Sequence, residues 1–274
     1  MTLLDLLDRT TVFFERKKIE SARIQAEHLV ARVLKKKRLE LYLEFDRTMQ
    51  ESELDELRPL VKRRADGEPL QHILGDTEFY GLRIQCDSRA LIPRPESEIL
   101  VEKVLDTLEG QRPGTLVDVG TGTGCLALAC SRHLPDWNVI GTDISNDAIA
   151  LARENQNLHP MLQVEWRQGS LLESLDQAAD AIIANLPYLT DIEIGSLPPE
   201  VTYDPKLALA GGSDGLDLIR QLCENISSDT KYIFLEAGIS HNDALKDLLQ
   251  KAGFSEIEVF PDLNRQLRFA YGTR

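Results

Sequence analysis

The residues best suited to chemistry follow one apolar run, in which residues 181–184 lead into Asn185, Leu186, Pro187 and Tyr188. The Asn185 side chain offers one acceptor and two donors, and Pro187 fixes its own φ and restricts the residue before it. Tyr188 adds a flat face with a polar tip. The pattern predicts a rigid site at the edge of a sheet that holds a planar, uncharged nitrogen group. The alternative is an ordinary strand-ending turn, because Asn and Pro are common turn residues.

A glycine-rich turn precedes this site, and residues 118–124 read Asp-Val-Gly-Thr-Gly-Thr-Gly. Glycines let a backbone approach a ligand closely, and the start of the expected following helix favours polar or anionic groups. The dinucleotide fingerprint needs a third glycine where Cys125 stands, and the Gly-Lys-Ser/Thr of a phosphate-binding P-loop is missing. The turn therefore indicates a nucleoside ligand with a short charged tail.

Asp143 ends the next expected strand, nineteen residues after Gly124. A carboxylate at such a place accepts hydrogen bonds from both hydroxyls of a ribose. The alternative role is an N-cap for the following helix, for which Ser145 is also suited. The paired glycine turn favours the ribose role.

Strands and helices that alternate from Thr115 onward must position these residues. The expected strands are residues 115–119, 138–143, 163–167, 179–184 and 232–236, followed by late strands at 256–260 and 267–271. The expected helices are residues 97–108, 125–133, 146–155, 215–225 and 242–252. Such alternation with short connections predicts an α/β fold whose mostly parallel sheet is covered on both faces.

The chain divides into three expected parts: a small helical domain at 1–66, a hairpin-like connector at 67–92 and a catalytic domain at 93–274. Glycines and Pro69 punctuate short extended pieces in the connector.

In the helical domain, apolar residues of 22–34 recur at helical spacing, and Ser21 is expected to cap that helix. A second helix is expected at 51–65, kinked or split by Pro59.

The formal net charge of −14 is unevenly distributed. Residues 1–90 hold 17 basic and 17 acidic residues, whereas residues 91–274 hold 14 and 28. An acidic catalytic half is a poor partner for phosphate backbones, so no direct contact with nucleic acid is expected. The basic run at 35–38 reads either as a solvated helix end or as a patch that binds a partner.

The four cysteines form no Cys-x-x-Cys pair and the five histidines show no ligand spacing, so we expect buried free thiols and no metal. No apolar run approaches the ~20 residues needed to span a bilayer. The acids among the leucines of the first residues make a poor signal peptide. We therefore expect no membrane association and a cytoplasmic location.

The glycine turn, the segment Thr-Asp-Ile-Ser at 142–145 and Asn-Leu-Pro-Tyr at 185–188 resemble class I S-adenosylmethionine-dependent methyltransferases. The wider chain resembles the protein glutamine methyltransferases that modify peptide chain release factors. That wider resemblance rests on residues 21–23, 68–75, 78–82, 92–96, 203–209 and 211–216. It implies a Rossmann-like, mostly parallel sheet with an antiparallel late strand, preceded by a small helical domain.

The resemblance also implies roles for individual residues. The methionine part of S-adenosylmethionine would be cradled by Gly120, Thr121, Gly122, Thr123 and Gly124. Asp143 would hold the ribose, and Ser170 and Leu171 would lie at the adenine. Asn185, Leu186, Pro187 and Tyr188 would hold the target glutamine, with Asn185 also beside the cofactor. Arg94 and Glu96 would close the pocket or, alternatively, form a salt bridge between domains.

Two positions depart from the pattern of the family. The family usually has Asn-Pro-Pro-Tyr, and Leu186 keeps the backbone carbonyl but loses some rigidity. Ser170 stands where the family often has an acidic residue, and it is shorter and uncharged.

The resemblance implies methylation of the glutamine in the Gly-Gly-Gln motif of release factors, by a monomer whose helical domain grips the protein substrate. One alternative is the sister activity on a ribosomal protein glutamine. Another is a nucleic-acid adenine-N6 methyltransferase, because ribosomal RNA adenine dimethyltransferases also use Asn-Leu-Pro-Tyr. A third is a binding module that has lost catalysis. The Pro-Arg-Pro-Glu segment at 93–96, the domain order and the charge favour release factor glutamine.

Overall fold

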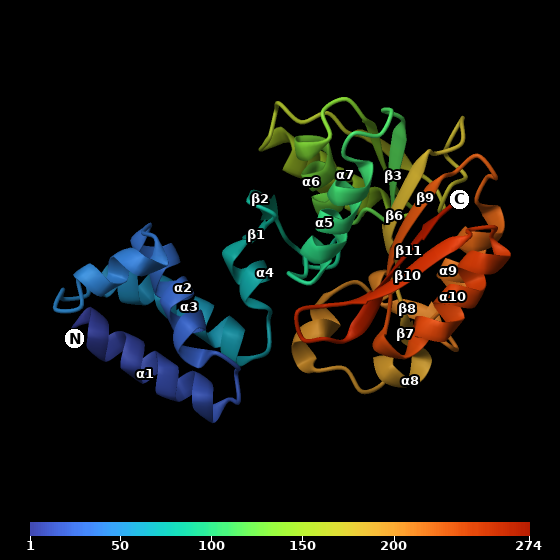
Figure 1. Cartoon of the computed structure of the whole chain (residues 1–274). Helices are drawn as coiled ribbons and strands as arrows, with labels where there is room; N and C mark the ends of the chain where they lie inside the picture. The colour runs from blue at the N-terminus through green and yellow to red at the C-terminus, as the bar shows by residue number, and fades with distance from the viewer. The chain divides into compact units, whose positions relative to one another are not determined.

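The computed structural model describes residues 1–274 (Figure 1). The chain forms two compact units. The first comprises residues 1–75 together with 199–203, and the second comprises residues 76–198 and 204–274. The boundary of the units falls within the expected connector, whose standing as a separate part remains a prediction.

The first unit is helical and packs around one apolar core. It contains α1 (Leu3–Arg16), α2 (Ala22–Leu34), α3 (Glu51–Ala65), the short α4 (Leu70–Leu74) and the 3-10 helices η1 (Arg38–Leu43) and η2 (Pro199–Tyr203). Thr2 caps α1 through a reciprocal pair of bonds with Asp5. The core is fully buried at Leu3, Leu7, Phe14, Leu29 and Leu41.

The expected side-chain cap at Ser21 is wrong, and of the two expected effects of Pro59 the split is wrong, whereas the kink stays a prediction. Ser21 occupies the N-cap position of α2 but makes no side-chain cap, because its backbone is left-handed (φ 49°) and a capping side chain requires an extended backbone. Helix α3 is not split at Pro59. Pro59 and Asp55 lie on the exposed face, where water can bind the carbonyl that loses its N–H partner.

The second unit is built on a seven-stranded sheet in the order β10-β11-β9-β6-β3-β4-β5. Its parallel strands are β3 (Thr115–Val119), β4 (Asn138–Asp143), β5 (Glu165–Gln168), β6 (Ala181–Asn185) and β9 (Tyr232–Glu236). Strand β11 (Leu267–Thr273) runs antiparallel to both β9 and β10 (Glu256–Pro261). The predicted mostly parallel sheet with an antiparallel late strand is confirmed.

Helices cover both faces of this sheet, as Figure 1 shows. Helices α5 (Ser97–Leu108), α6 (Cys125–His133) and α7 (Asn146–Asn157) contribute to one core, around Leu100, Leu128 and Ile149. Helices α9 (Asp217–Asn225) and α10 (Asn242–Lys251) contribute to the other, around Ile219 and Leu249. The strands between the two cores are apolar on both faces, as expected for a buried parallel sheet.

Two smaller pieces complete the second unit. Strands β1 (Asp76–Phe79) and β2 (Leu82–Gln85) form the expected antiparallel hairpin. Between β6 and α9, the chain forms β7 (Leu189–Thr190), α8 (Asp191–Ile194), η3 (Lys206–Ala208) and β8 (Ala210–Gly212), none of which the sequence predicts. The short η4 (Ile239–His241) precedes α10. None of the helices has the length and apolar character that crossing a bilayer requires.

Candidate active site

A cavity opens at the carboxyl ends of four neighbouring parallel strands, where α/β sheets bind ligands. The loop after each of these strands contributes to its wall: Gly120–Thr123 after β3, Asp143–Ser145 at the end of β4, Gly169–Leu171 after β5 and Asn185–Pro187 at the end of β6. Further walls come from Arg89–Arg94 and from Pro205, Leu207 and Ala208. The structure thus brings together most of the residues singled out in the sequence.

Hydrogen bonds to the Thr142 carbonyl and to the Asp118 carboxylate hold the glycine turn in shape. The backbone N–H groups of Gly120 and Thr121 both donate to the Thr142 carbonyl at 2.9 Å. The buried Asp118 carboxylate accepts from the Thr121 hydroxyl and from the Ala127 N–H at the start of α6. Burial raises the pKa of Asp118 to about 7. Asp118 therefore ties the turn to the helix that follows it.

Gly124 does not line the cavity, unlike the four residues before it. A Cβ at this position would lie 2.7 Å from the Trp166 ring and 3.0 Å from Ala152 Cβ. The glycine therefore lets a strand and helix α7 pack closely behind the turn, and its expected cradle role stays a prediction.

The Asp143 carboxylate bridges the glycine turn and the residue that caps helix α7. One carboxylate oxygen accepts from the Gly122 N–H at 2.9 Å, and the other accepts from the Ser145 N–H at 2.9 Å. The cap of α7 is Ser145, whose hydroxyl accepts from Ala148 N–H. Burial raises the pKa of Asp143 above its ordinary value. A carboxylate has about four acceptor sites, so Asp143 retains capacity for ribose hydroxyls.

Ser170 and Leu171 line the same cavity beyond Asp143. Leu171 has a left-handed backbone (φ 50°), and its carbonyl accepts from the Thr142 hydroxyl at 2.9 Å. Its apolar side chain offers a surface for a flat ring. The Ser170 side chain is short, and it forms no hydrogen bond within the chain.

Asn185 ends β6 and faces a hydrogen-bonded chain that sequence reasoning missed. Its Nδ2 donates to the Ser97 hydroxyl oxygen at 3.2 Å, and that hydroxyl donates to a Glu236 carboxylate oxygen at 2.6 Å. Ser97 and Glu236 are both almost fully buried. The other polar atom of the Asn185 side chain, Oδ1, accepts no hydrogen bond within the chain, and it is not among the buried unpaired atoms. A charged residue ending the apolar strand β9 was the available sequence signal.

Leu186 and Pro187 line the cavity, whereas Tyr188 does not. The Leu186 side chain packs on the glycine turn, where a Cβ on Gly120 would lie 2.9 Å from its Cδ2. The Leu186 carbonyl accepts no hydrogen bond from the chain. The Tyr188 carbonyl approaches Gly215 so closely that a Cβ there would lie 2.3 Å away. Burial raises the pKa of Tyr188 to about 12.

Arg94 lines the cavity and Glu96 does not. Arg94 binds Asp204 at 3.0 Å, and both residues belong to the second unit, so this is no salt bridge between domains. Asp204 is buried and also accepts from the Ile92 N–H at 3.4 Å. These bonds fasten the loop that carries Pro205 to the segment before α5. Glu96 takes the N-cap position of α5.

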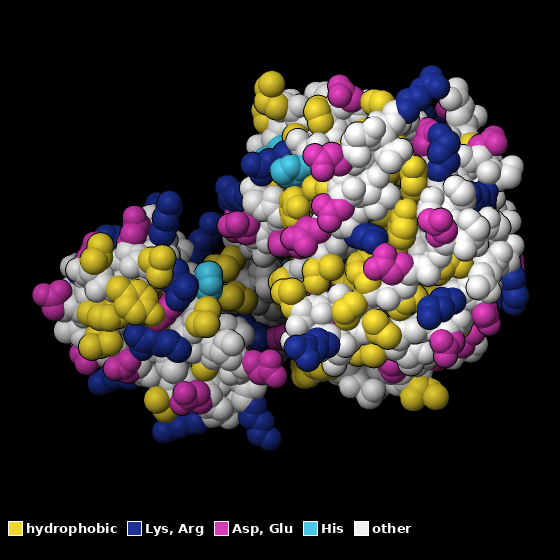
Figure 2. All heavy atoms as spheres, viewed as in Figure 1, with side chains coloured by type: hydrophobic (Ala, Val, Ile, Leu, Met, Phe, Trp, Pro, Cys, Tyr) yellow, Lys and Arg dark blue, Asp and Glu magenta, His cyan; other side chains and the backbone are white.

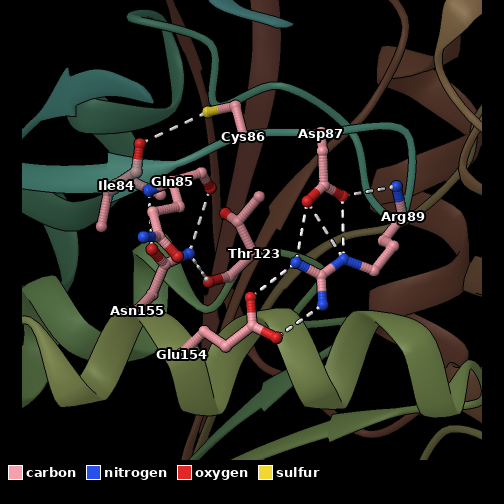
Figure 3. Close-up of polar contacts among 8 residues, drawn as sticks. All are labelled: Ile84, Gln85, Cys86, Asp87, Arg89, Thr123, Glu154 and Asn155. Atoms are coloured by element: carbon pink, nitrogen blue, oxygen red, sulfur yellow. Dashed lines mark hydrogen bonds and ion pairs between the residues drawn. The ribbon is translucent and has the colours of Figure 1, made fainter. Parts of the chain in front are cut away.

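Residues 85–89, which end β2 and lead to the cavity, are anchored to α7, as Figure 3 shows. Buried Asn155 accepts from the Gln85 N–H at 2.6 Å and donates to the carbonyls of Gln85 and Thr123. Arg89 pairs with Asp87 and with Glu154 (Figure 3). One wall of the cavity is thereby tied to the glycine turn.

No group of His, Cys, Asp or Glu side chains is arranged to hold a metal ion. All four cysteines are free and buried.

Comparisons with known proteins cover both units. The PrmC N-terminal domain family matches residues 5–75, and the Methyltransferase small domain family matches residues 95–196. The release factor glutamine methyltransferase of Geobacter sulfurreducens is 37% identical over 268 residues, covering 96% of this chain and 93% of its own. That of Deinococcus radiodurans is 36% identical over 277 residues, covering 100% and 99%.

Among solved structures, the hMettl16 catalytic domain in complex with MAT2A 3′UTR hairpin 6 has a TM-score of 0.58 at 16% identity. The match covers 76% of this chain and 82% of that one. At this identity the likeness bears on the fold alone.

Proposed function

The chain belongs to the release factor glutamine methyltransferase family, and we propose that it methylates the side-chain amide nitrogen of a release factor glutamine. S-adenosylmethionine is the cofactor and supplies an electrophilic methyl group on its sulfonium when bound. The target glutamine is that of the Gly-Gly-Gln motif.

One observation carries the proposal: two acceptors on consecutive residues at the end of β6 have no hydrogen-bond donor within the chain. They are Asn185 Oδ1 and the Leu186 carbonyl, on consecutive residues that both line the cavity. A primary amide has two N–H hydrogens, so it can donate one to each acceptor. Such a pair selects a neutral –NH₂ group and fixes its orientation.

These two acceptors compensate for the low nucleophilicity of the target nitrogen. An amide nitrogen is a poor nucleophile because its lone pair is delocalised into the carbonyl. Asn185 and Leu186 orient the nitrogen toward the glycine turn. Their oxygens also stabilise positive charge that develops on the nitrogen, an interaction that is stronger in the transition state than in the ground state. No strong general base is required, because the methylated amide loses its proton readily.

The other predicted residues fit the cofactor. Asp143 has free acceptor sites for the ribose, and Leu171 offers an apolar surface for the adenine ring. Gly120, Thr121, Gly122 and Thr123 line the same cavity as Asn185 and would hold the methionine portion. Tyr188 and Glu96 are assigned supporting roles outside the cavity, since neither lines it.

We further propose that residues 1–66 bind the protein substrate and that one chain is the active unit in the cytoplasm. Figure 2 shows acidic and basic side chains interspersed over the visible surface of both units, without an extended basic face suited to nucleic acid. The acidic balance of residues 91–274 also weighs against a nucleic-acid substrate.

The experiment offers radiolabelled S-adenosylmethionine and three substrates in parallel: unmodified release factor, ribosomal subunits and DNA. Label on a release factor glutamine, located by peptide mass spectrometry, is expected. Label on a ribosomal protein would reassign the substrate within the glutamine chemistry. Label on nucleic acid alone would overturn the proposal.

A further inference from the structure

The Ser97 hydroxyl joins two side chains that come from different strands. It donates to Glu236 at 2.6 Å and accepts from Asn185 Nδ2 at 3.2 Å. Ser97 is the first residue of α5, and Glu236 ends β9, beside β6. None of the roles proposed above uses Ser97 or Glu236.

A serine hydroxyl has one hydrogen, and an ionised carboxylate can only accept. The hydrogen of Ser97 is therefore committed to Glu236, which leaves only lone pairs facing Asn185. An amide that meets those lone pairs must present its NH₂ group. Asn185 Oδ1 is thereby directed away from Ser97 and left without a partner inside the protein.

We infer that Ser97 and Glu236 are positioning residues for methyl transfer, which act together to hold the Asn185 amide with its oxygen toward the target nitrogen. The inference rests on the proposed function and deepens it. Neither residue needs to touch the substrate. Together they decide which end of the amide does.

The opposite orientation of the Asn185 amide would weaken two contacts, one with Ser97 and one with the target glutamine. Oδ1 would face the Ser97 oxygen with no hydrogen between them, which leaves two buried acceptors opposed. Nδ2 would face the cavity as a donor and would repel the hydrogens of a glutamine NH₂ group. A side chain that can also donate would not commit the Ser97 hydrogen in this way, and the carboxylate at this point in the sheet, with 1% exposure, can only accept when it is ionised.

The test compares Ser97→Ala with Ser97→Thr, which restores a hydroxyl. The matched control is Thr107→Ala, which removes from the same helix a hydroxyl that donates to the Lys103 carbonyl. For each variant, kcat on release factor, the Kd of S-adenosylhomocysteine and the melting temperature are measured. Ser97→Ala is expected to lower kcat by about tenfold or more with the Kd preserved. Ser97→Thr should recover most of kcat, and Thr107→Ala should behave as wild type.

The second arm tests whether Glu236 acts through Ser97. Glu236→Gln offers an NH₂ group to Ser97 and frees its hydrogen, so kcat should fall in the single variant. In the Ser97→Ala background the same change should lower kcat no further. Independent, multiplicative losses in the double variant would overturn the relay.

Failure of the inference is distinguishable from failure of the function. A wild-type enzyme that labels release factor, together with a Ser97→Ala variant of undiminished kcat, would refute the inference alone. Loss of kcat matched by equal loss of cofactor affinity would assign Ser97 a structural role and refute it likewise. A wild-type enzyme that labels no glutamine would overturn the function and the inference with it.

Discussion

Asn185 and Glu236 are paired at the last register position shared by β6 and β9. The amide that faces the cavity and the buried carboxylate that orients it through Ser97 therefore end adjacent strands of one sheet. Sites built on strands are held more precisely than sites built on loops. The separation of the two side chains is set by strand pairing, and the loop after Asn185 only completes the clamp.

The rate of methyl transfer should fall at acid pH. Burial raises the pKa of Glu236 to about 7, and only the ionised form commits the Ser97 hydrogen. As the pH falls through about 7, Glu236 takes up a proton, Ser97 is released and kcat should decline. Above that pH, kcat should be level.

The other groups around Glu236 do not reproduce this dependence. Arg268 on β11 and Arg94 before α5 favour the charged carboxylate, whereas Glu96 disfavours it. Tyr188 stays neutral in this range because burial raises its pKa to about 12. A pH profile of kcat at saturating substrates checks the point. An acid limb of kcat that persists unchanged in Glu236→Gln would contradict the assignment and point to Asp118, whose pKa burial also raises to about 7.

Replacing Asp143 by Ala should weaken cofactor binding by about 10- to 100-fold, because hydrogen bonds to a charged group are lost. The kcat at saturating cofactor should change far less, since Asp143 is distant from the transferred group in the proposed arrangement. Calorimetric titration with S-adenosylhomocysteine measures the effect. Asp136→Ala, at an exposed position before β4, is the control. Equal affinities in the two variants would remove Asp143 from the cofactor site.

Gly124→Ala should destabilise the protein more than Gly110→Ala does. Both glycines have left-handed backbones, with φ of 81° and 73°, so both variants bear about 1 kcal/mol of strain. Only Gly124 faces Trp166, at 2.7 Å from the added Cβ, whereas nothing lies within 4 Å at Gly110. Overpacking should add about 1–3 kcal/mol to the loss at Gly124. Denaturant unfolding of the two variants gives the difference, and equal free energies of unfolding would exclude the packing role.

Asn155→Asp should cost about 2–4 kcal/mol of stability, because the donors to the Gln85 and Thr123 carbonyls disappear from a buried site. Asn157→Asp on the exposed side of the same helix makes the same chemical change and should cost less than about 1 kcal/mol. Equal melting temperatures for the two variants would show that Asn155 does not anchor the segment drawn in Figure 3.

Local patterns predicted most of the second unit because apolar runs and glycine turns leave a direct trace in the sequence. Helix α5 matches its expected bounds, and β3 and β9 do as well. Strand β5 begins at Glu165, two residues later than expected. The segment between β6 and α9 went unpredicted, because its short elements carry no periodic pattern and are held by close backbone approach at Gly215.

The strand ends that carry the site were predicted, whereas the buried contacts behind them were missed. Asn185 and Asp143 end strands, so the sheet was bound to bring them to one edge. The packing role of Gly124 was not predicted because its partner, Trp166, lies on another strand. Ser97 and Glu236 were missed because the charge that ends β9 does not by itself indicate a partner, and their bond exists only after α5 and β9 are packed together.

The central claim is that the Asn185 amide holds a glutamine for methylation. The most direct test is the initial rate of methyl incorporation into the release factor glutamine by Asn185→Ala, with cofactor affinity measured on the same preparation. The exposed Asn225→Ala serves as the control. The rate should fall by about 100-fold or more while the affinity for S-adenosylhomocysteine is retained. A variant that methylates the glutamine at the wild-type rate would contradict the account.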